Sequence, residues 1–349
     1  MNVGDLASAG KASLGSLIDR LRLDSMVCAG QVAILAYHRV VTGDELAKGY
    51  IEPGMYVLQN VFEMQLRWLR ERTEILSFDQ LLALWSKDEW DERKKYCVLT
   101  FDDGWLDNYH YAYPLLRQYR VPATIFLPTN FVGSDEWFWT ERVAFVLSHL
   151  LSLHERAPER RHTVALLADR FDVCPDESRI QDGDSRVIVH ELIGRCKSLT
   201  PDQIEEVIGR LGRILNVSFP KERMTVNWEE VSEMAKHGLS FGSHSCSHHL
   251  LTRLNEERVR WEIQESDRVL RTLPQGYLPV FCYPNGDNSS VIQEMVRQSH
   301  YVAAVGTRTG TEGRKPRNRF ELRRIGMHND VSRTAPLLSF HLFRSACGF

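Results

Sequence analysis

The chain has 349 residues, of which 43% are hydrophobic and 26% charged, and its net charge at pH 7 is -3. This composition is typical of a folded globular protein, and the charge predicts neither a nucleic-acid surface nor a polybasic membrane patch. No stretch approaches the roughly 18 apolar residues that a transmembrane helix needs. The seven cysteines contain no CxxC pair, so neither a zinc ribbon nor a disulfide framework is indicated.

The first 30 residues are predicted to form an N-terminal helical extension. Leu14, Ile18 and Leu21 recur at helical spacing and predict a short amphipathic helix. The segment has no cationic head followed by an apolar core, so it is not an ordinary secretory signal. Together with the free thiols, this pattern leads us to expect a cytoplasmic protein.

Short apolar runs alternate with amphipathic segments along the rest of the chain. The runs predicted to be strands are residues 33–38, 98–103, 123–129, 239–244, 280–286, 302–307 and 321–327. The helices predicted between them include residues 61–69, 227–238 and 255–273. Asn227 is expected to cap the second of these helices, and the third has one stripe formed by Val259, Ile263, Ser266 and Leu270. Strands that alternate with helices imply parallel pairing through right-handed crossovers. Seven such strands predict an α/β fold, in the form of a barrel or a distorted barrel.

Residues 144–223 interrupt this alternation and have the pattern of several consecutive helices. We predict one helical insertion between the third and fourth strands, acting as a lid, a subdomain or an oligomer contact. The expected organisation is an N-terminal extension (1–30), the first part of a barrel (31–143), the insertion (144–223) and the second part of the barrel (224–349). The sequence leaves the oligomeric state open.

Two adjacent carboxylates, Asp102 and Asp103, follow the apolar run at residues 97–101. Because side chains alternate along a strand, both can face one way only if the strand has ended. Two close carboxylates also repel, so one pKa rises unless a cation lies between them. The simpler interpretation is a strand that runs into an Asp-Gly turn, since turns favour both residue types.

Polar side chains gather at the predicted strand ends. The residues at or just past the carboxyl end of a predicted strand are His38, Asp102, Asp103, His244, Asn285 and His328. In parallel α/β folds these ends converge on the active site. We therefore predict one shared site at the mouth of the barrel, although a structural role for His38 is equally open.

The segment SHSCSHH, residues 243–249, has the spacing of a metal site. His244 and His248 are four residues apart, so one helical turn would place both imidazoles on the same face. His249 leaves open which histidine pairs with His244. Joined to the Asp102–Asp103 pair, the histidines form a His₂Asp set of the kind that binds catalytic Zn²⁺, which this set does not distinguish from Co²⁺, Mn²⁺ or Ni²⁺. A cation on one aspartate lets its neighbour stay ionised as a base, as in hydrolases of amides or esters.

Four stretches carry a resemblance to a known family. They are YHRV (37–40), TFDDG (100–104), HSCSHH (244–249) and FCYPNG (281–286), in this order along the chain. The chain resembles the polysaccharide deacetylases, the carbohydrate esterase group with a NodB-homology domain. The resemblance covers about two-thirds of the chain and implies a distorted (β/α)7 barrel that removes N-acetyl groups from sugars with a divalent metal, Zn²⁺ above all.

The resemblance also implies residue roles. Asp102 would be the general base, and Asp103, His244 and His248 would be the metal ligands, which decides for His248 over His249. The backbone N–H of Asn285 would help to hold the oxyanion.

Two positions depart from the family pattern. Cys282 stands where many members have an arginine that orients the base, and Arg324 in the last predicted strand is the candidate substitute. The acid histidine of the family lies in a Leu-x-His motif, which RRIGMHND matches only loosely. His328 is therefore the candidate acid, with a solvated loop histidine as the alternative.

Tryptophans near the predicted rim allow two interpretations. Trp105 follows the Asp-Asp pair, and Trp137 and Trp139 follow the third predicted strand. Each is either a platform for a sugar ring or part of the core.

The sequence thus predicts a carbohydrate amide hydrolase that acts on an N-acetylated sugar, releases acetate and has no nucleic-acid partner. Two rivals remain: a deacylase of another N-acyl group or of a non-sugar amide, and an inactive relative that binds glycan. Since no secretory signal is recognised, we expect a glycan precursor or a capsule-type glycan as the substrate.

Overall fold

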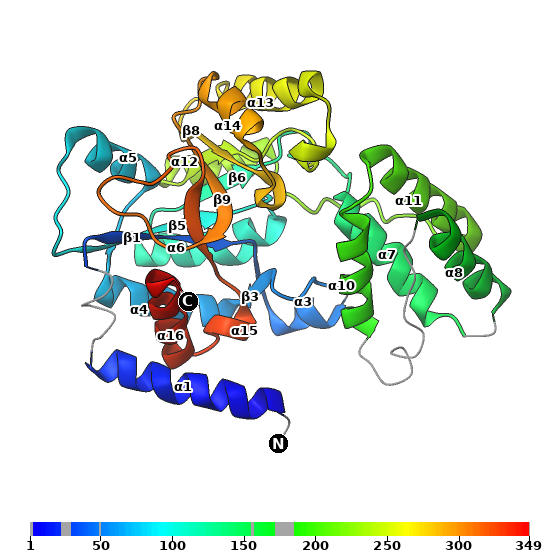
Figure 1. Cartoon of the computed structure of the whole chain (residues 1–349), viewed down its shortest axis with the longest axis horizontal. Helices are drawn as coiled ribbons and strands as arrows, with labels where there is room; N and C mark the ends of the chain where they lie inside the picture. The colour runs from blue at the N-terminus through cyan, green and yellow to red at the C-terminus, as the bar shows by residue number, and fades with distance from the viewer. Residues whose placement is uncertain (1–2, 22–28, 49, 155–156, 172–184, 349) are drawn as a thin grey trace. The chain divides into compact units, whose positions relative to one another are not determined.

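The computed structural model describes residues 3–21, 29–48, 50–154, 157–171 and 185–348 (Figure 1). The chain divides into two compact units, each with its own contacts. The first comprises residues 1–43, 54–134 and 225–349, and the second comprises residues 44–53 and 135–224. No helix within the described residues is long and apolar enough to cross a membrane.

The first unit is a closed barrel of parallel strands, as predicted. The barrel strands are β1 (Gln31–Tyr37), β5 (Lys95–Phe101), β6 (Thr124–Leu127), β7 (Ser240–Ser243), β8 (Tyr277–Cys282), β9 (Ala303–Thr309) and β10 (Leu322–Gly326). Each pairs in parallel with the next in this order, and β10 pairs with β1 to close the ring. The short strand β4 (Glu74–Ile75) adds to the edge of β5 outside the ring. Every predicted strand segment therefore forms a barrel strand.

The barrel strands are buried on both faces, as expected of parallel strands covered by helices. Side chains alternate between two apolar clusters: Val98 and Leu322 belong to one, and Leu99 and Phe101 pack with helix α4 in the other. The first cluster draws side chains from strands around the ring, so it fills the interior. Arg324, two residues after Leu322, faces this interior.

Helices surround the barrel where the sequence predicts them. They include α4 (Gln59–Arg72), α12 (Trp228–Lys236) and α13 (Glu256–Leu270). The side chain of Asn227 accepts a hydrogen bond from the N–H of Glu230, and the Glu230 side chain accepts one in return, which forms a capping box at the start of α12. The predicted apolar stripe of α13 is buried, and one glutamate, Glu262, is buried with it.

The remaining elements of the first unit connect these parts. They are α1 (Val3–Leu21), β2 (Arg39–Val41), β3 (Tyr56–Leu58), α5 (Phe78–Lys87), α6 (Tyr113–Tyr119), α14 (Ser290–Arg297), α15 (Asn329–Ser332) and α16 (Ala335–Cys347), with a π-helical turn at Asn108–Ala112 and 3₁₀ turns at Leu251–Arg253 and Pro284–Gly286. The predicted N-terminal helix forms and packs side by side with α16 (Figure 1). Ile18 is buried, whereas Leu14 is 48% exposed, so Leu14 lies outside the buried face.

The second unit is helical and has a core of its own. Its helices are α7 (Trp139–Ser152), α8 (Pro158–Phe171), α10 (Ser185–Cys196) and α11 (Pro201–Leu215), and the short helix α3 (Gly43–Lys48) runs into its first segment. Leu147, Leu192 and Ile208 bring α7, α10 and α11 together in one apolar cluster. The unit contains the whole of residues 144–223 and also takes in residues 44–53 and 135–143.

Candidate active site

Asp102 and Asp103 reach the same rim because strand β5 ends one residue before Asp102. The backbone N–H of Asp102 still donates to Tyr37 O of β1 at 2.9 Å, and the chain then turns into the left-handed region at Asp103 (φ 71°) and Gly104 (φ 62°). A Cβ at position 104 would lie 2.6 Å from a methyl carbon of Leu127, so both this contact and the positive φ favour glycine there. The left-handed turn, and not strand alternation, brings both carboxylates toward the site.

Asp103 faces two imidazoles. Its Oδ1 atom lies 3.3 Å from His244 Nε2 and 3.1 Å from His248 Nε2. Its Oδ2 atom accepts a hydrogen bond of 2.9 Å from the indole N–H of Trp105, which fixes the direction of the carboxylate. Burial alone would raise the pKa of Asp103, but the nearby His248 and His244 outweigh it and hold the pKa well below its usual range.

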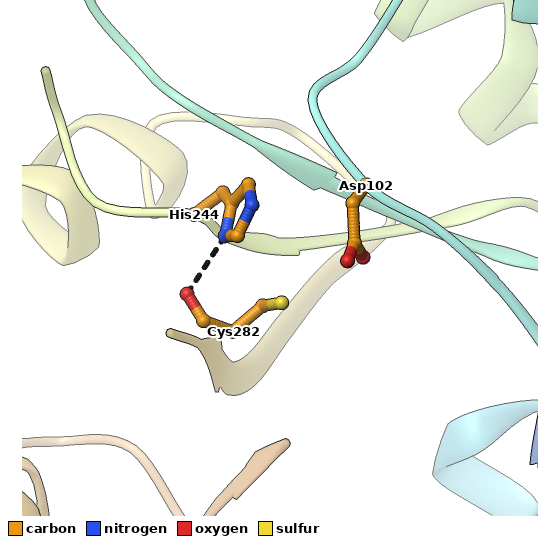
Figure 2. A group of neighbouring side chains, drawn as sticks. All are labelled: Asp102, His244 and Cys282. Carbon is orange, nitrogen blue, oxygen red and sulfur yellow. Dashed lines mark hydrogen bonds between the residues drawn. The ribbon is translucent and has the colours of Figure 1, made fainter. Parts of the chain in front are cut away.

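His244 is oriented by the backbone of β8. Its Nδ1 lies 2.8 Å from Cys282 O, as the dashed line in Figure 2 shows. A carbonyl oxygen can only accept, so Nδ1 carries a proton, and Nε2 is the ring nitrogen that faces Asp103. This arrangement, with one ring nitrogen anchored to a carbonyl, is usual for histidines that bind a metal.

The loop from His244 to His248 differs from the helical turn that the histidine spacing predicts. We expected a helical turn to bring the two imidazoles together, but residues 244–250 form no helix. Instead Ser245 (φ 63°) and His248 (φ 55°) both adopt left-handed backbone conformations. This irregular loop places the two rings 4.9 Å apart in an edge-to-face arrangement.

Asp102 has a different partner, the buried guanidinium of Arg324 on β10. Arg324 NH1 and NH2 each donate to one carboxylate oxygen of Asp102 at 2.7 Å, and Arg324 Nε donates to Gly306 O at 2.9 Å. Burial alone would raise the pKa of Asp102, but the charge and hydrogen bonds of Arg324 hold it below its ordinary value. The predicted contact between Arg324 and the candidate base is confirmed. Cys282 also contacts the guanidinium, with Sγ 3.3 Å from NH2.

Among the residues that the structure describes, two groups of side chains have the composition of a metal site, and they share His244. The first is Asp103, His244 and His248, and the second is Asp102, His244 and Cys282, drawn in Figure 2. Both oxygens of Asp102 are occupied by Arg324, which disfavours a second cation at that group. By contrast, Asp103 Oδ1 is buried and makes no aligned hydrogen bond among the described residues. The first group therefore fits a divalent metal such as Zn²⁺.

Two histidines at the rim are candidates for the acid. His38 follows β1, its side chain is 24% exposed, and its Nε2 lies 3.7 Å from Asp102 Oδ2. His328 caps α15, with Nδ1 3.3 Å from Asp330 Oδ2. Within the described part of the chain, the hydrogen bonds and ion pairs of His328 join it to α15 and not to either aspartate. The geometry thus favours His38 as the acid over His328, the candidate that the sequence indicated.

Asn285 lies directly beyond β8 in the 3₁₀ turn Pro284–Gly286. Its backbone is left-handed (φ 56°), and the N–H of Gly286 donates to Tyr283 O at 2.8 Å. Asp103, His248 and Asn285 are therefore all non-glycine residues with positive φ, and such conformations concentrate at functional sites.

Trp105 donates a hydrogen bond to Asp103 and is too buried to be an exposed platform for a sugar ring. The residue is 3% exposed, and the guanidinium of Arg39 lies over its ring at 4.6 Å. Arg39 Nε in turn donates to Asp107 Oδ2 at 2.7 Å. No pattern in the sequence indicated this support, although Arg39 lies in the YHRV stretch.

Trp137 and Trp139 belong to the second unit. Trp139 is buried in the apolar cluster of that unit. Trp137 is partly exposed, donates its indole N–H to Glu222 O at 3.0 Å and packs edge-to-face on Phe145. For Trp105 and Trp139, burial excludes an open sugar platform.

Known proteins resemble this chain in sequence and in fold. Among curated proteins, the putative polysaccharide deacetylase YxkH of Bacillus subtilis is 28% identical over 158 residues, which cover 45% of this chain and 50% of that protein. The poly-β-1,6-N-acetyl-D-glucosamine N-deacetylase of Staphylococcus aureus is 33% identical over 82 residues, covering 23% of this chain and 28% of that protein. The chain thus spans half or less of these relatives.

A similar fold is found in the Streptococcus pyogenes deacetylase PplD, solved in complex with acetate. The TM-score is 0.55 at 19% identity, with 89% of this chain and 98% of that chain covered. The family model described as polysaccharide deacetylase matches residues 90–165 and 204–304, which include both aspartates, both histidines and Asn285. These segments make up just over half of the chain, which therefore belongs to the polysaccharide deacetylase family.

Proposed function

We propose that the protein is a divalent-metal-dependent hydrolase that removes the N-acetyl group from an amino sugar in a glycan or glycan precursor. The bond cleaved is a C–N bond other than a peptide bond, and the products are acetate and a free amine. Zn²⁺ is the metal we expect, with Co²⁺, Mn²⁺ and Ni²⁺ as substitutes for the same ligand set.

One observation carries the proposal: two adjacent buried carboxylates have different partners. Asp103 faces the imidazoles of His244 and His248, whereas Asp102 is held by Arg324. Partners of this kind assign one carboxylate to a metal and leave the other free of it. A general base and a metal site then lie side by side, as hydrolysis of an amide requires.

A divalent metal held by Asp103, His244 and His248 would act as a Lewis acid and lower the pKa of water. Asp102 takes the proton of the attacking water. Arg324 keeps Asp102 ionised and fixes both of its oxygens, so the base is available at neutral pH. The Nδ1–H group of His244 donates to Cys282 O, which leaves Nε2 as the ligand atom.

The later steps use the other residues of the rim. The backbone N–H of Asn285 donates to the oxyanion that forms when the acetamide carbonyl is attacked. His38, 3.7 Å from Asp102, then protonates the departing amine, with His328 as the competing candidate. An imidazole suits this step because histidine is the side chain that most often acts as a general acid or base.

The proposed substrate class follows from the relatives. One is named as an N-deacetylase of poly-β-1,6-N-acetyl-D-glucosamine, so β-1,6-linked N-acetylglucosamine oligosaccharides are the first substrates to try. N-acetylated sugar nucleotides and lipid-linked sugars form the second set, in keeping with the proposed cytoplasmic location. The acyl group is tested with N-formyl analogues of whichever sugar reacts.

The test is acetate release by the wild type and by Asp102→Asn after loading with Zn²⁺. The variant should bind metal like the wild type and lose at least 100-fold in kcat, because general-base catalysis typically contributes 10²–10⁴-fold. Asp267→Asn is the matched control, since it removes a buried carboxylate that pairs with Arg271 and His300 instead. Full activity of Asp102→Asn would overturn the base assignment. Glycan binding without turnover by the metal-loaded wild type would favour the inactive relative.

A further inference from the structure

Glu262 is a charged side chain buried beneath the loop that carries the two histidines. It lies on α13 and is 0% exposed. Its Oε2 atom accepts hydrogen bonds from the backbone N–H groups of Cys246 at 2.8 Å and Ser247 at 2.9 Å. Its Oε1 atom accepts from the hydroxyl of Ser247 and, at 3.1 Å, from Nε of Arg258. One carboxylate thus holds the middle of the loop from His244 to His248.

The backbone of this loop needs such support. Ser245 and His248 both have positive φ, which is unfavourable for residues with a Cβ. Such conformations persist only where surrounding contacts fix them. The two N–H groups bound by Glu262 belong to the two residues between Ser245 and His248. Successive N–H groups that point at one site form an anion-binding concavity, which the glutamate fills from within the protein.

Stability alone does not explain a carboxylate at this place. Burial of a charge is unfavourable, and an apolar side chain of similar size often stabilises a protein as well as a buried ion pair does. The charge-assisted hydrogen bonds to the loop and to Arg258 offset that penalty. However, an apolar residue at position 262 would not hold the N–H groups of Cys246 and Ser247 in one direction.

The support that Glu262 gives to the loop matters more for the position of His248 than for that of His244. His244 directly follows β7 and is anchored by its own contact with Cys282 O. His248 comes at the far end of the loop, with Nε2 3.1 Å from Asp103 Oδ1. Its backbone N–H donates to Ser245 Oγ at 3.1 Å, so its position depends on the fold of the loop itself.

We propose that Glu262 is a positioning residue that preorganises His248 for metal binding by holding the loop from within. This inference rests on the proposed metal site. It assigns to α13 a part in the site that neither the histidine spacing nor the Asp-Asp pair reveals.

The test is Co²⁺ binding to the metal-free protein, measured by competition with a chromophoric chelator and by the visible spectrum of bound Co²⁺. Glu262→Gln keeps the shape of the side chain but removes the charge and turns an NH₂ group toward donors. We expect a 10- to 100-fold weaker affinity, the usual effect of losing a hydrogen-bond partner behind metal ligands. Glu265→Gln is the matched control, because Glu265 lies on the same helix and pairs with Arg268 near the surface. Its affinity should stay within about twofold of the wild type.

Urea unfolding of the metal-free variants separates positioning from general stability. Glu262→Asp, which keeps the charge, should bind Co²⁺ more tightly than Glu262→Gln and serves if the latter does not fold. If both variants lose stability but bind Co²⁺ like the wild type, Glu262 is only structural and the inference is overturned. If the wild type itself binds no Co²⁺, the proposed metal site fails, and the inference fails with it.

Discussion

Replacing Arg324 by methionine should destabilise the protein by about 3–5 kcal/mol, the usual effect of removing one partner of a buried ion pair. Arg324 and Asp102 are 2% and 3% exposed and are joined by two hydrogen bonds of 2.7 Å. Methionine fills the space but leaves the carboxylate buried without its main cation. Burial would then raise the pKa of Asp102, and catalysis would appear only at higher pH.

The magnitude is measured by urea unfolding of the metal-free protein at pH 7, in a double-mutant cycle with Asp102→Asn. In the Asp102→Asn background no carboxylate is left unpaired, so Arg324→Met should be less destabilising there by about 1–3 kcal/mol. Equal destabilisation in the two backgrounds would refute the reasoning, because Arg324 would then act through packing and not through its charge.

Two further predictions concern histidines outside the metal set. His38→Ala should lower kcat by about 10²-fold or more while metal content is unchanged, and His328→Ala should have a small effect; the reverse order would make His328 the acid. Burial lowers the pKa of His341 from 6.5 to about 4. As the pH falls, His341 binds a proton in the unfolded chain before it does so in the folded protein. The free energy of unfolding should therefore fall by about 3 kcal/mol between pH 6.5 and pH 4. His341→Gln should lose this part of the slope in urea unfolding, and identical slopes in variant and wild type would contradict it.

The fold was predictable because its signals are local. Each barrel strand is a short apolar run, and parallel strands buried on both faces need no finer pattern. The Asn227 cap and the apolar stripe of α13 are also local, and both are confirmed. Placement of Asp102 and Asp103 on one rim follows from where β5 ends, which the Asp-Asp-Gly sequence marks.

The sequence did not reveal the contacts that depend on tertiary packing. Spacing suggested a helical turn for His244 and His248, whereas the loop reaches the same result through two left-handed residues. In the sequence, Glu262 is one of several charged residues of a helix, and nothing there indicates that its carboxylate accepts hydrogen bonds from the loop that carries the histidines. Only the closed barrel brings β10 beside β1 and so one strand away from β5, where Arg324 contacts Asp102 across 222 positions of the sequence.

The proposal that Asp103, His244 and His248 form a metal site supports the rest of the account. It is tested most directly by the metal content of the purified protein, measured by elemental mass spectrometry for the wild type and His248→Ala. The account predicts about one equivalent of Zn²⁺ or a similar divalent ion in the wild type, because one His₂Asp set binds one ion, and little or none in the variant. A wild type that holds no metal, even after incubation with Zn²⁺, would contradict the account and would favour a glycan-binding protein without hydrolytic activity.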